Sequence, residues 1–258
     1  MNTLTQRDAQ TMLNKVPEVT LFFWIIKIMA TTVGETAADF LNVNLGFGLG
    51  GTSLVMGGLL VAALFAQLRA CRYIPSIYWV SVVLISVFGT LVTDNLVDNF
   101  GVSLQTTTVI FSLALLATFS AWYLSEKTLS IHSIFTTRRE LFYWAAILFT
   151  FALGTAAGDL AAEGLQLGYA TSAVLFGAAI AVVTIAHYAL GLNPVLAFWI
   201  AYILTRPFGA SCGDLLSQPL ANGGLGLGTV GTSAIFLVTI LGLVGYLSAT
   251  QNRLADES

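Results

Sequence analysis

The sequence predicts an all-α fold, an integral membrane bundle of eight transmembrane helices built from four two-helix repeats in two pseudo-symmetric halves. Three observations support this fold class. First, 57% of the 258 residues are hydrophobic and only 9% are charged, whereas soluble domains carry about 25% charged residues. Second, eight apolar segments reach the ~20 residues that a helix needs to cross a bilayer. Third, one pattern of Trp, Gly and Asp occurs four times.

The apolar segments follow one another at short intervals, so we expect a single membrane domain over residues 1–258. Polar residues occupy both ends and the connection at 125–140, which gives expected tails at 1–18 and 249–258. The first half covers 19–128 and the second half 129–248. The expected spans are 19–41, 48–68, 77–97, 104–124, 142–162, 168–190, 195–217 and 227–248.

Basic residues set the expected orientation. Eight of the ten Lys and Arg residues lie in the tails and in alternate connections, and the intervening connections carry none. Loops rich in Lys and Arg face the cytoplasm, so we predict a multi-pass protein of the bacterial inner membrane with both termini cytoplasmic. No removable signal peptide is expected, because no short apolar run with a small-residue cleavage site follows the amino-terminal charges. The eight residues are Arg7, Lys15, Arg69, Arg72, Lys127, Arg138, Arg139 and Arg253.

Internal repetition accounts for the even number of spans. In each copy a Gly follows a Trp by ten residues and an Asp follows it by fifteen. Since every copy holds two spans, all four copies enter the membrane in the same sense, which predicts a pseudo-symmetry axis along the membrane normal. The copies contain Trp24, Gly34 and Asp39; Trp79, Gly89 and Asp94; Trp144, Gly154 and Asp159; Trp199, Gly209 and Asp214.

Seven acidic residues lie within or at the ends of the odd-numbered spans, where an ionised side chain costs about 2.5–3.5 kcal/mol on an insertion scale. Three pairs of these acids are four residues apart, which puts both carboxylates on one helix face. Like charges at this spacing repel, so helix stability does not explain the pairs. The seven acids are Glu35, Asp39, Asp94, Asp98, Asp159, Glu163 and Asp214.

Lys27 and Arg206 are the two remaining basic residues, and both lie inside spans. With all seven acids ionised, five negative charges would be left unbalanced, so some acids must carry protons, water or a bound cation. We expect Lys27 and Arg206 to be charge-tuning residues, with Lys27 paired to Glu35 and Arg206 to Asp214. Pro207 is expected to break or kink the seventh span.

Hydroxyl side chains begin the second span of each copy, and Gln218 follows Asp214 at the spacing of the acid pairs. Carboxylate, hydroxyl and amide oxygens are hard ligands, which suit Mg2+, Mn2+ or Ca2+ better than soft metals. We therefore predict the seven acids as metal ligands, with no cofactor other than a bound divalent cation. The supporting side chains are Thr52, Thr107, Ser172, Thr232 and Gln218.

Several of these residues also have plain structural interpretations. Asp98 and Glu163 lie near helix ends and are equally well explained as interfacial groups. The four repeated Asp residues are also suited to hydrogen bonding between helices. The repeated Trp residues are more typical of packing or interface anchors than of binding groups.

The repeat resembles that of bacterial membrane proteins built from four tandem copies of a repeat of unknown function, each with two transmembrane regions and a characteristic Trp. The residues that carry the resemblance run from Lys15-Val-Pro17-Glu-Val-Thr20 through Phe23-Trp24 to Thr31-Thr-Val-Gly34-Glu35 and Asp39. It covers nearly the whole chain and implies the topology, not the chemistry. The fourth copy departs from the first, since Ala210 stands in the place of Glu35 and Arg206 in that of Thr31.

The acid excess favours a cation transporter, and we expect proton-coupled export of a divalent metal, with Mn2+ as the first candidate. The alternatives are a passive cation channel, a small organic-solute carrier or a non-transporting membrane component. An enzyme is not expected, because no HExxH or GxSxG motif is present. The net charge of −3 argues against nucleic acid. The expected partners are the lipid bilayer and the transported ion or solute, and the oligomeric state stays open.

Overall fold

The computed structural model describes residues 14–256, and the regular elements in this part of the chain are all helical. Eight of the helices are long and apolar enough to cross a membrane, which confirms the predicted fold class. Residues 1–13 of the expected amino-terminal tail, with Arg7, and residues 257–258 lie outside the described part.

The eight helices agree with the predicted spans to within a few residues at most ends. The largest difference is at α9 (Gly228–Asp256), which continues eight residues beyond the predicted end at 248. Helix α6 begins at Thr137, five residues before the predicted start at 142, because the Thr136 side chain accepts a hydrogen bond from the backbone of Arg139 and caps the helix. In the first part of each copy lie α2 (Leu21–Asp39), α4 (Pro75–Asp94), α6 (Thr137–Asp159) and α8 (Pro194–Ser217). In the second part lie α3 (Gly48–Arg69), α5 (Leu104–Glu126), α7 (Tyr169–Leu190) and α9 (Gly228–Asp256).

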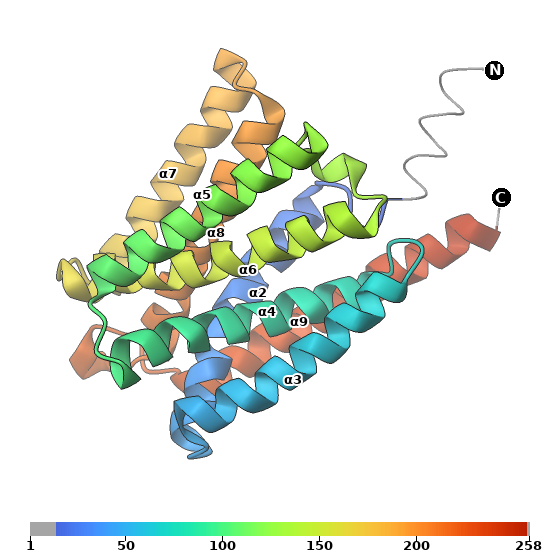
Figure 1. Ribbon diagram of the computed structural model, residues 1–258. Coiled ribbons are helices and arrows are strands. Elements are labelled where there is room, and N and C mark those ends of the chain that lie inside the picture. Colours follow the sequence, from blue (N-terminus) through green and yellow to red (C-terminus); the bar gives the residue numbers. More distant parts are fainter. Residues whose placement is uncertain (1–13, 257–258) are drawn as a thin grey trace, which may run out of the picture.

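The first helices of the four copies form the centre of the bundle. Helices α2, α4, α6 and α8 pack in a closed ring, in which α8 returns to α2. Each outer helix packs mainly against the central helix of the next copy: α3 on α4, α5 on α6, α7 on α8, and α9 on α2. Figure 1 shows the central helices in the middle of the bundle, with α3, α5 and α7 around them.

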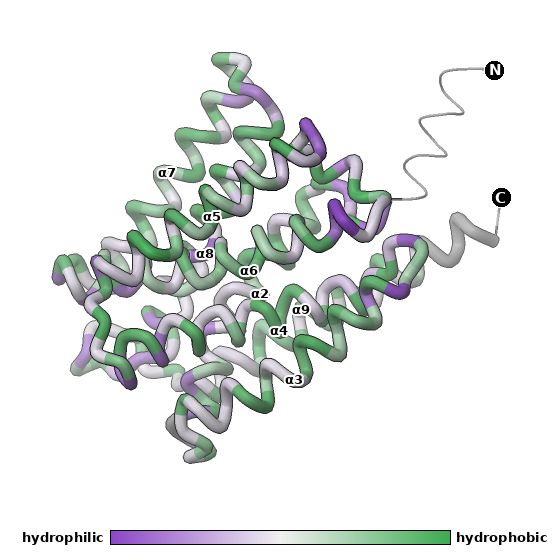
Figure 2. The backbone as a smooth tube through the Cα atoms, viewed as in Figure 1, coloured by the Kyte–Doolittle hydropathy of each residue, from purple (hydrophilic) through white to green (hydrophobic). Residues whose placement is uncertain are grey.

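The central helices are largely buried, whereas the outer helices expose most of their apolar surface. Figure 2 shows long hydrophobic stretches on the outer helices and hydrophilic residues concentrated at the helix ends. An exposed apolar belt of this kind matches the hydrocarbon of a bilayer. The described chain also begins and ends at the same end of the bundle (Figure 1), as an even number of spans requires.

Close approach of the central helices depends on the repeated Gly. We number positions in each copy from its Trp, taken as zero, so this Gly is at position 10. In every copy the side chain at position 7 of the next copy packs on the Gly: Ser86 on Gly34, Phe151 on Gly89, Arg206 on Gly154 and Thr31 on Gly209. A Cβ at Gly89 would lie 2.8 Å from the Phe151 Cβ, closer than real Cβ atoms come. The repeated Gly is therefore a packing requirement of the ring.

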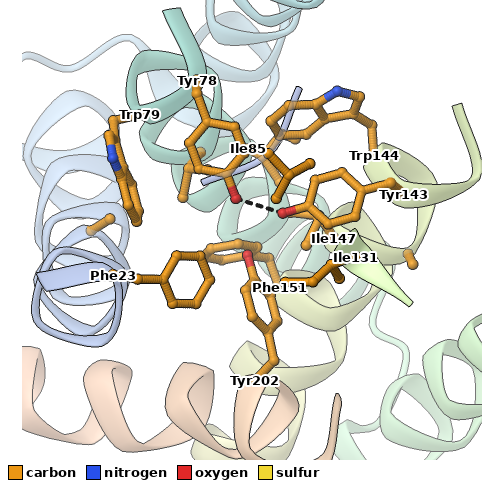
Figure 3. Close-up of a cluster of buried hydrophobic side chains, with 14 of the residues drawn as sticks. Phe23, Tyr78, Trp79, Ile85, Ile131, Tyr143, Trp144, Ile147, Phe151 and Tyr202 are labelled. Atoms are coloured by element: carbon orange, nitrogen blue, oxygen red, sulfur yellow. Dashed lines mark hydrogen bonds between the residues drawn. The ribbon is translucent and has the colours of Figure 1, made fainter. Parts of the chain in front are cut away.

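Aromatic side chains close one end of this ring, where the central helices begin and the basic connections lie. The residues before each Trp meet here: the hydroxyls of Tyr78 and Tyr143 share a hydrogen bond of 2.5 Å, and the rings of Phe23 and Phe198 are 5.9 Å apart. Figure 3 shows this cluster with Tyr202 below the tyrosine pair. We call this end the basic end and the opposite one the acidic end.

A buried ion pair that the sequence analysis missed lies at the basic end. The Nζ of Lys15 is 2.7 Å from Oε2 of Glu140 and donates to the backbone oxygen of Leu68. The Gln67 amide donates to the other oxygen of Glu140 at 3.1 Å. Lys15 was expected in a polar tail and is instead 8% exposed. This network attaches the segment before α2 to α3 and α6.

At the acidic end, α2, α4 and α6 continue into π-helical turns, which start directly after the repeated Asp at Phe40–Asn44, Asn95–Asn99 and Leu160–Gly164. The fourth copy differs, because α8 ends at Ser217 and Gln218 has extended backbone. The sequence analysis did not anticipate these wider turns. They are often found at functional sites, and here they adjoin the acids.

The packing predicts that Gly209→Ala destabilises the ring. The added Cβ would overlap Oγ1 of Thr31 and lie 3.2 Å from the backbone oxygen of Ile28, and such overpacking costs about 1–3 kcal/mol. The matched control is Gly58→Ala, also in a helix but with nothing within 4 Å of the added Cβ. Thermal unfolding of both purified variants in detergent checks this, and equal midpoints would contradict the packing account.

Candidate functional site

Three acids from three different copies converge inside the bundle. One carboxylate oxygen each from Glu35 on α2, Asp159 on α6 and Asp214 on α8 lie within 4.8 Å of one another. Glu35 is 6% exposed and Asp214 8%, and Asp159 is partly buried. These three residues are among the seven acids that the sequence predicts as metal ligands.

Arg206 is fully buried beside this group and connects all four copies. Its Nη2 donates to Oε2 of Glu35 at 2.9 Å, to Oγ1 of Thr155 at 2.7 Å and to the hydroxyl of Thr90. Its Nη1 donates to the backbone oxygen of Thr31 at 3.2 Å. Position 11 of the first three copies is occupied by Glu35, Thr90 and Thr155. Arg206, which belongs to the fourth copy, therefore links position 11 of the three other copies. In its own copy position 11 is the small Ala210.

The two predicted pairings of the basic residues were wrong. Arg206 pairs with Glu35 rather than Asp214. Lys27 was expected to pair with Glu35, but its Nζ has no hydrogen-bond partner among the described residues. The geometry explains both, since eight residues along one helix rise about 12 Å, too far for either pair. Helix α2 packs against α8, and Glu35 reaches Arg206 across this contact.

Lys27 is instead enclosed by aromatic rings. It is fully buried, and its Nζ is 4.0 Å from the centroid of the Phe151 ring and 4.3 Å from that of Tyr202. The faces of aromatic rings attract cations. The ammonium thus lies between the aromatic cluster of the basic end and the position of Arg206.

Pro207 leaves α8 continuous. The helix runs from Pro194 to Ser217 with Pro207 inside it, so the expected break is not formed. The ring of Pro207 packs instead against α6, where a Cβ at Gly154 would lie 3.0 Å from its Cδ.

The remaining predicted ligands are less deeply placed. Asp39 and Asp94 are partly buried, whereas Asp98 and Glu163 are exposed at the acidic end. Glu163 accepts a hydrogen bond from the Tyr169 hydroxyl at 3.2 Å. Asp98 and Glu163 both lie in the π-helical turns that follow the repeated Asp.

The predicted supporting hydroxyls are buried but do not bond to the three acids. Thr107 and Thr232 donate to backbone oxygens one turn earlier in their own helices, and the hydroxyls of Thr52 and Ser172 have no partner among the described residues. Gln218 is held through its backbone, which bonds to Asp214 and Gly226. The hydroxyls that do reach the site are Thr90 and Thr155, which the sequence analysis missed. Aligning the copies at position 11 with Glu35 would have found them.

A family comparison agrees with this repeat structure. The model of a family described as Repeat of Unknown Function (DUF347) matches residues 22–73, 77–128, 142–192 and 197–253. The chain belongs to this family. The four matched segments are the four copies that form the ring, which confirms the predicted resemblance, and in this member of DUF347 the site lies where the copies meet. Neither curated proteins nor solved structures give a match.

The charges of the group are unevenly balanced. Glu35 has Arg206 as its counterion, whereas Asp159 and Asp214 have no ion-pair partner within 4.0 Å in the described part of the chain. Carboxylates that converge away from bulk water repel one another. The group therefore requires protons, water or a cation to balance it, and its oxygens are those that hard cations prefer.

A cavity of about 640 Å³ opens at the basic end between α2, α7, α8 and the connection at 129–132. Its walls include Trp24, Phe198 and the two histidines, His132 and His187. Thr205, directly before Arg206, also lines it. The cavity thus extends from the end of the bundle to the residue next to the site.

The buried ion pair predicts a large and coupled effect on stability. Arg206→Met leaves Glu35 buried without a counterion and is expected to lower the free energy of unfolding by about 3–5 kcal/mol. The double variant Arg206→Met/Glu35→Gln is expected to lose less than Arg206→Met alone, because no charge is stranded. Chemical unfolding in detergent measures both.

The chain offers a matched control in the Arg139–Glu126 pair, of the same chemistry and with 2.8 Å between Nε and Oε2. Its Arg side chain is 24% exposed, so Arg139→Met is expected to destabilise the protein much less than Arg206→Met does. Equal losses for Arg139→Met and Arg206→Met would contradict a structural role for the buried pair.

Proposed function

We propose that this protein is a membrane transporter that exports a divalent metal cation in exchange for protons through the carboxylates of Glu35, Asp159 and Asp214. Mn2+ is the first candidate, on ligand chemistry alone. The observation that carries the proposal is the convergence of these three acids from separate repeats inside a membrane bundle. Placing an acid inside a membrane costs free energy, and acids found there mark the pathways of transported ions or protons.

Proton exchange follows from the ligands themselves. A carboxylate binds either a proton or a metal ion, so metal binding releases protons and acid releases the metal. One divalent cation against two protons leaves the charge of the site unchanged. In this scheme Asp159 and Asp214, which lack a basic partner among the described residues, carry the exchangeable protons.

Arg206 fits the scheme as an attached counterion. In the ion-free site its guanidinium neutralises Glu35. A metal ion that binds Glu35 competes with this contact, and the hydroxyls of Thr90 and Thr155 then continue to hold the guanidinium. The competition returns Arg206 to Glu35 when the metal leaves.

The packing favours alternating access over an open channel. The aromatic cluster closes the basic end of the ring (Figure 3). Arg206 and Lys27 are fully buried inside the bundle. At the other end Asp39 and Asp94 are partly exposed. Ions passing from one end to the other would require the central helices to rearrange.

A second candidate function is a carrier of small organic solutes, which the cavity at the basic end favours. Its volume of about 640 Å³ lies within the ~300–1,000 Å³ typical of small-molecule sites, and aromatic residues line it. If the substrate is organic, solutes are expected to compete with one another for the cavity, and divalent ions are not expected to bind.

Metal binding by the purified protein tests the leading proposal. Titration calorimetry with Mn2+ is expected to show saturable binding at neutral pH that weakens as the pH falls, because protons compete for the carboxylates. Asp159→Asn and Asp214→Asn are each expected to weaken binding by about 100-fold or more, equivalent to about 2.8 kcal/mol. The control is Asp98→Asn, an exposed acid outside the group, which is expected to bind as the unmodified protein does. Equal losses in all three variants would sink the assignment of the ligands.

Coupling is tested in proteoliposomes. An imposed pH gradient is expected to drive Mn2+ movement in the opposite direction to the protons, and added Mn2+ is expected to move protons in return, because the same carboxylates carry both. An internal Mn2+-sensitive dye and a pH dye measure the two fluxes. A Mn2+ flux that does not change with the pH gradient would identify a passive channel. The absence of any Mn2+ flux would favour the organic-solute carrier.

A further inference from the structure

The region between the aromatic cluster and the acids contains buried hydrogen-bond donors that have no partner among the described residues. Lys27 Nζ, Arg206 Nε and the Tyr202 hydroxyl are all buried and have no hydrogen-bond partner among the described residues. Two of the three belong to cationic side chains, which donate and never accept. Tyr78 and Tyr143 share one hydrogen bond, so one of their two O–H groups also remains to donate.

These donors gather around two aromatic rings. Lys27 Nζ lies 4.0 Å from the centroid of Phe151 and 4.3 Å from that of Tyr202, and the guanidinium carbon of Arg206 is 5.6 Å from the same Phe151 ring. Figure 3 shows the Tyr202 hydroxyl directed toward Phe151 and toward the hydroxyls of Tyr78 and Tyr143. The groups come from α2, α4, α6 and α8, so the region lies inside the ring.

The charges here point to an anion. Lys27 and Arg206 carry two positive charges when protonated, and their one ion-pair partner among the described residues is Glu35. The protonated form of Lys27 therefore has no counterion within ion-pair distance among the described residues. Leaving buried donors and a buried charge unpaired is costly, and the aromatic faces offset only part of that cost.

We propose that a small monovalent anion of the chloride class binds between Lys27 and Arg206, held by Lys27 Nζ, Arg206 Nε and the Tyr202 hydroxyl. The anion completes the charge balance of Lys27, Arg206 and Glu35. It leaves Asp159 and Asp214 to the exchangeable cation and protons. None of the three anion ligands is one of the proposed cation ligands, although Arg206 is also the ion-pair partner of Glu35.

Chloride binding to the purified full-length protein tests this site in the presence of a chelator, so that divalent metals play no part. Equilibrium binding of radiolabelled chloride is expected to be saturable. Tyr202→Phe removes one hydroxyl that has no partner in the described chain, and is expected to lower the chloride affinity by about 10-fold. Lys27→Met is expected to abolish saturable binding. Tyr246→Phe makes the same chemical change on an exposed side chain and is expected to leave the affinity unchanged.

Thermal unfolding gives a second measurement that does not depend on Lys27→Met folding. A bound anion stabilises the folded state by mass action, so the midpoint of the unmodified protein is expected to rise when gluconate is replaced by chloride. The rise is expected to shrink in Tyr202→Phe and to persist in Tyr246→Phe. No saturable binding, a midpoint that ignores chloride, or binding that survives both Tyr202→Phe and Lys27→Met would overturn the proposal.

Discussion

The structure depends on one buried guanidinium. Arg206 extends from the fourth copy and hydrogen bonds to Glu35, Thr90 and Thr155, the residues at position 11 of the three other copies. A single charged group thereby fixes how four similar helices meet. Any cation that binds Glu35 must compete with the Arg206 guanidinium. The interaction that holds the centre together therefore also governs the charge of the candidate site.

Differences between the four copies determine which chemical groups meet at their common centre. Four identical copies would place the same residue at position 11 four times, and the chain has instead one acid, two hydroxyls and Ala210. Lys27 and Arg206 likewise occur in one copy each. Symmetry supplies the convergence of the helices, and these substitutions turn the common centre into a site with a donor-rich side and an acid-rich side.

The features of the fold that depend on a local sequence pattern were predictable from the sequence. Hydropathy located the eight spans, and the spacing of Trp, Gly and Asp located the four copies, because both are properties of single segments. The partner of Arg206 was not predictable in this way, since Glu35 lies 171 residues away and reaches it only through packing between copies. The same holds for Lys15 with Glu140. The π-helical turns, which expose Asp98 and Glu163, have no signal in hydropathy. The cation-ligand role of the acids stays a prediction.

The order in which the helices pack also bears on how the protein is made. Because α3, α5 and α7 each pack on the helix that follows them, both members of these three pairs are synthesised in direct succession. Helix α2 is different, since two of its neighbours, α8 and α9, are the last to be synthesised. The acid-bearing first helix therefore lacks two of its main neighbours until the last two helices have been synthesised, and the site acquires its fourth side only when α8 inserts.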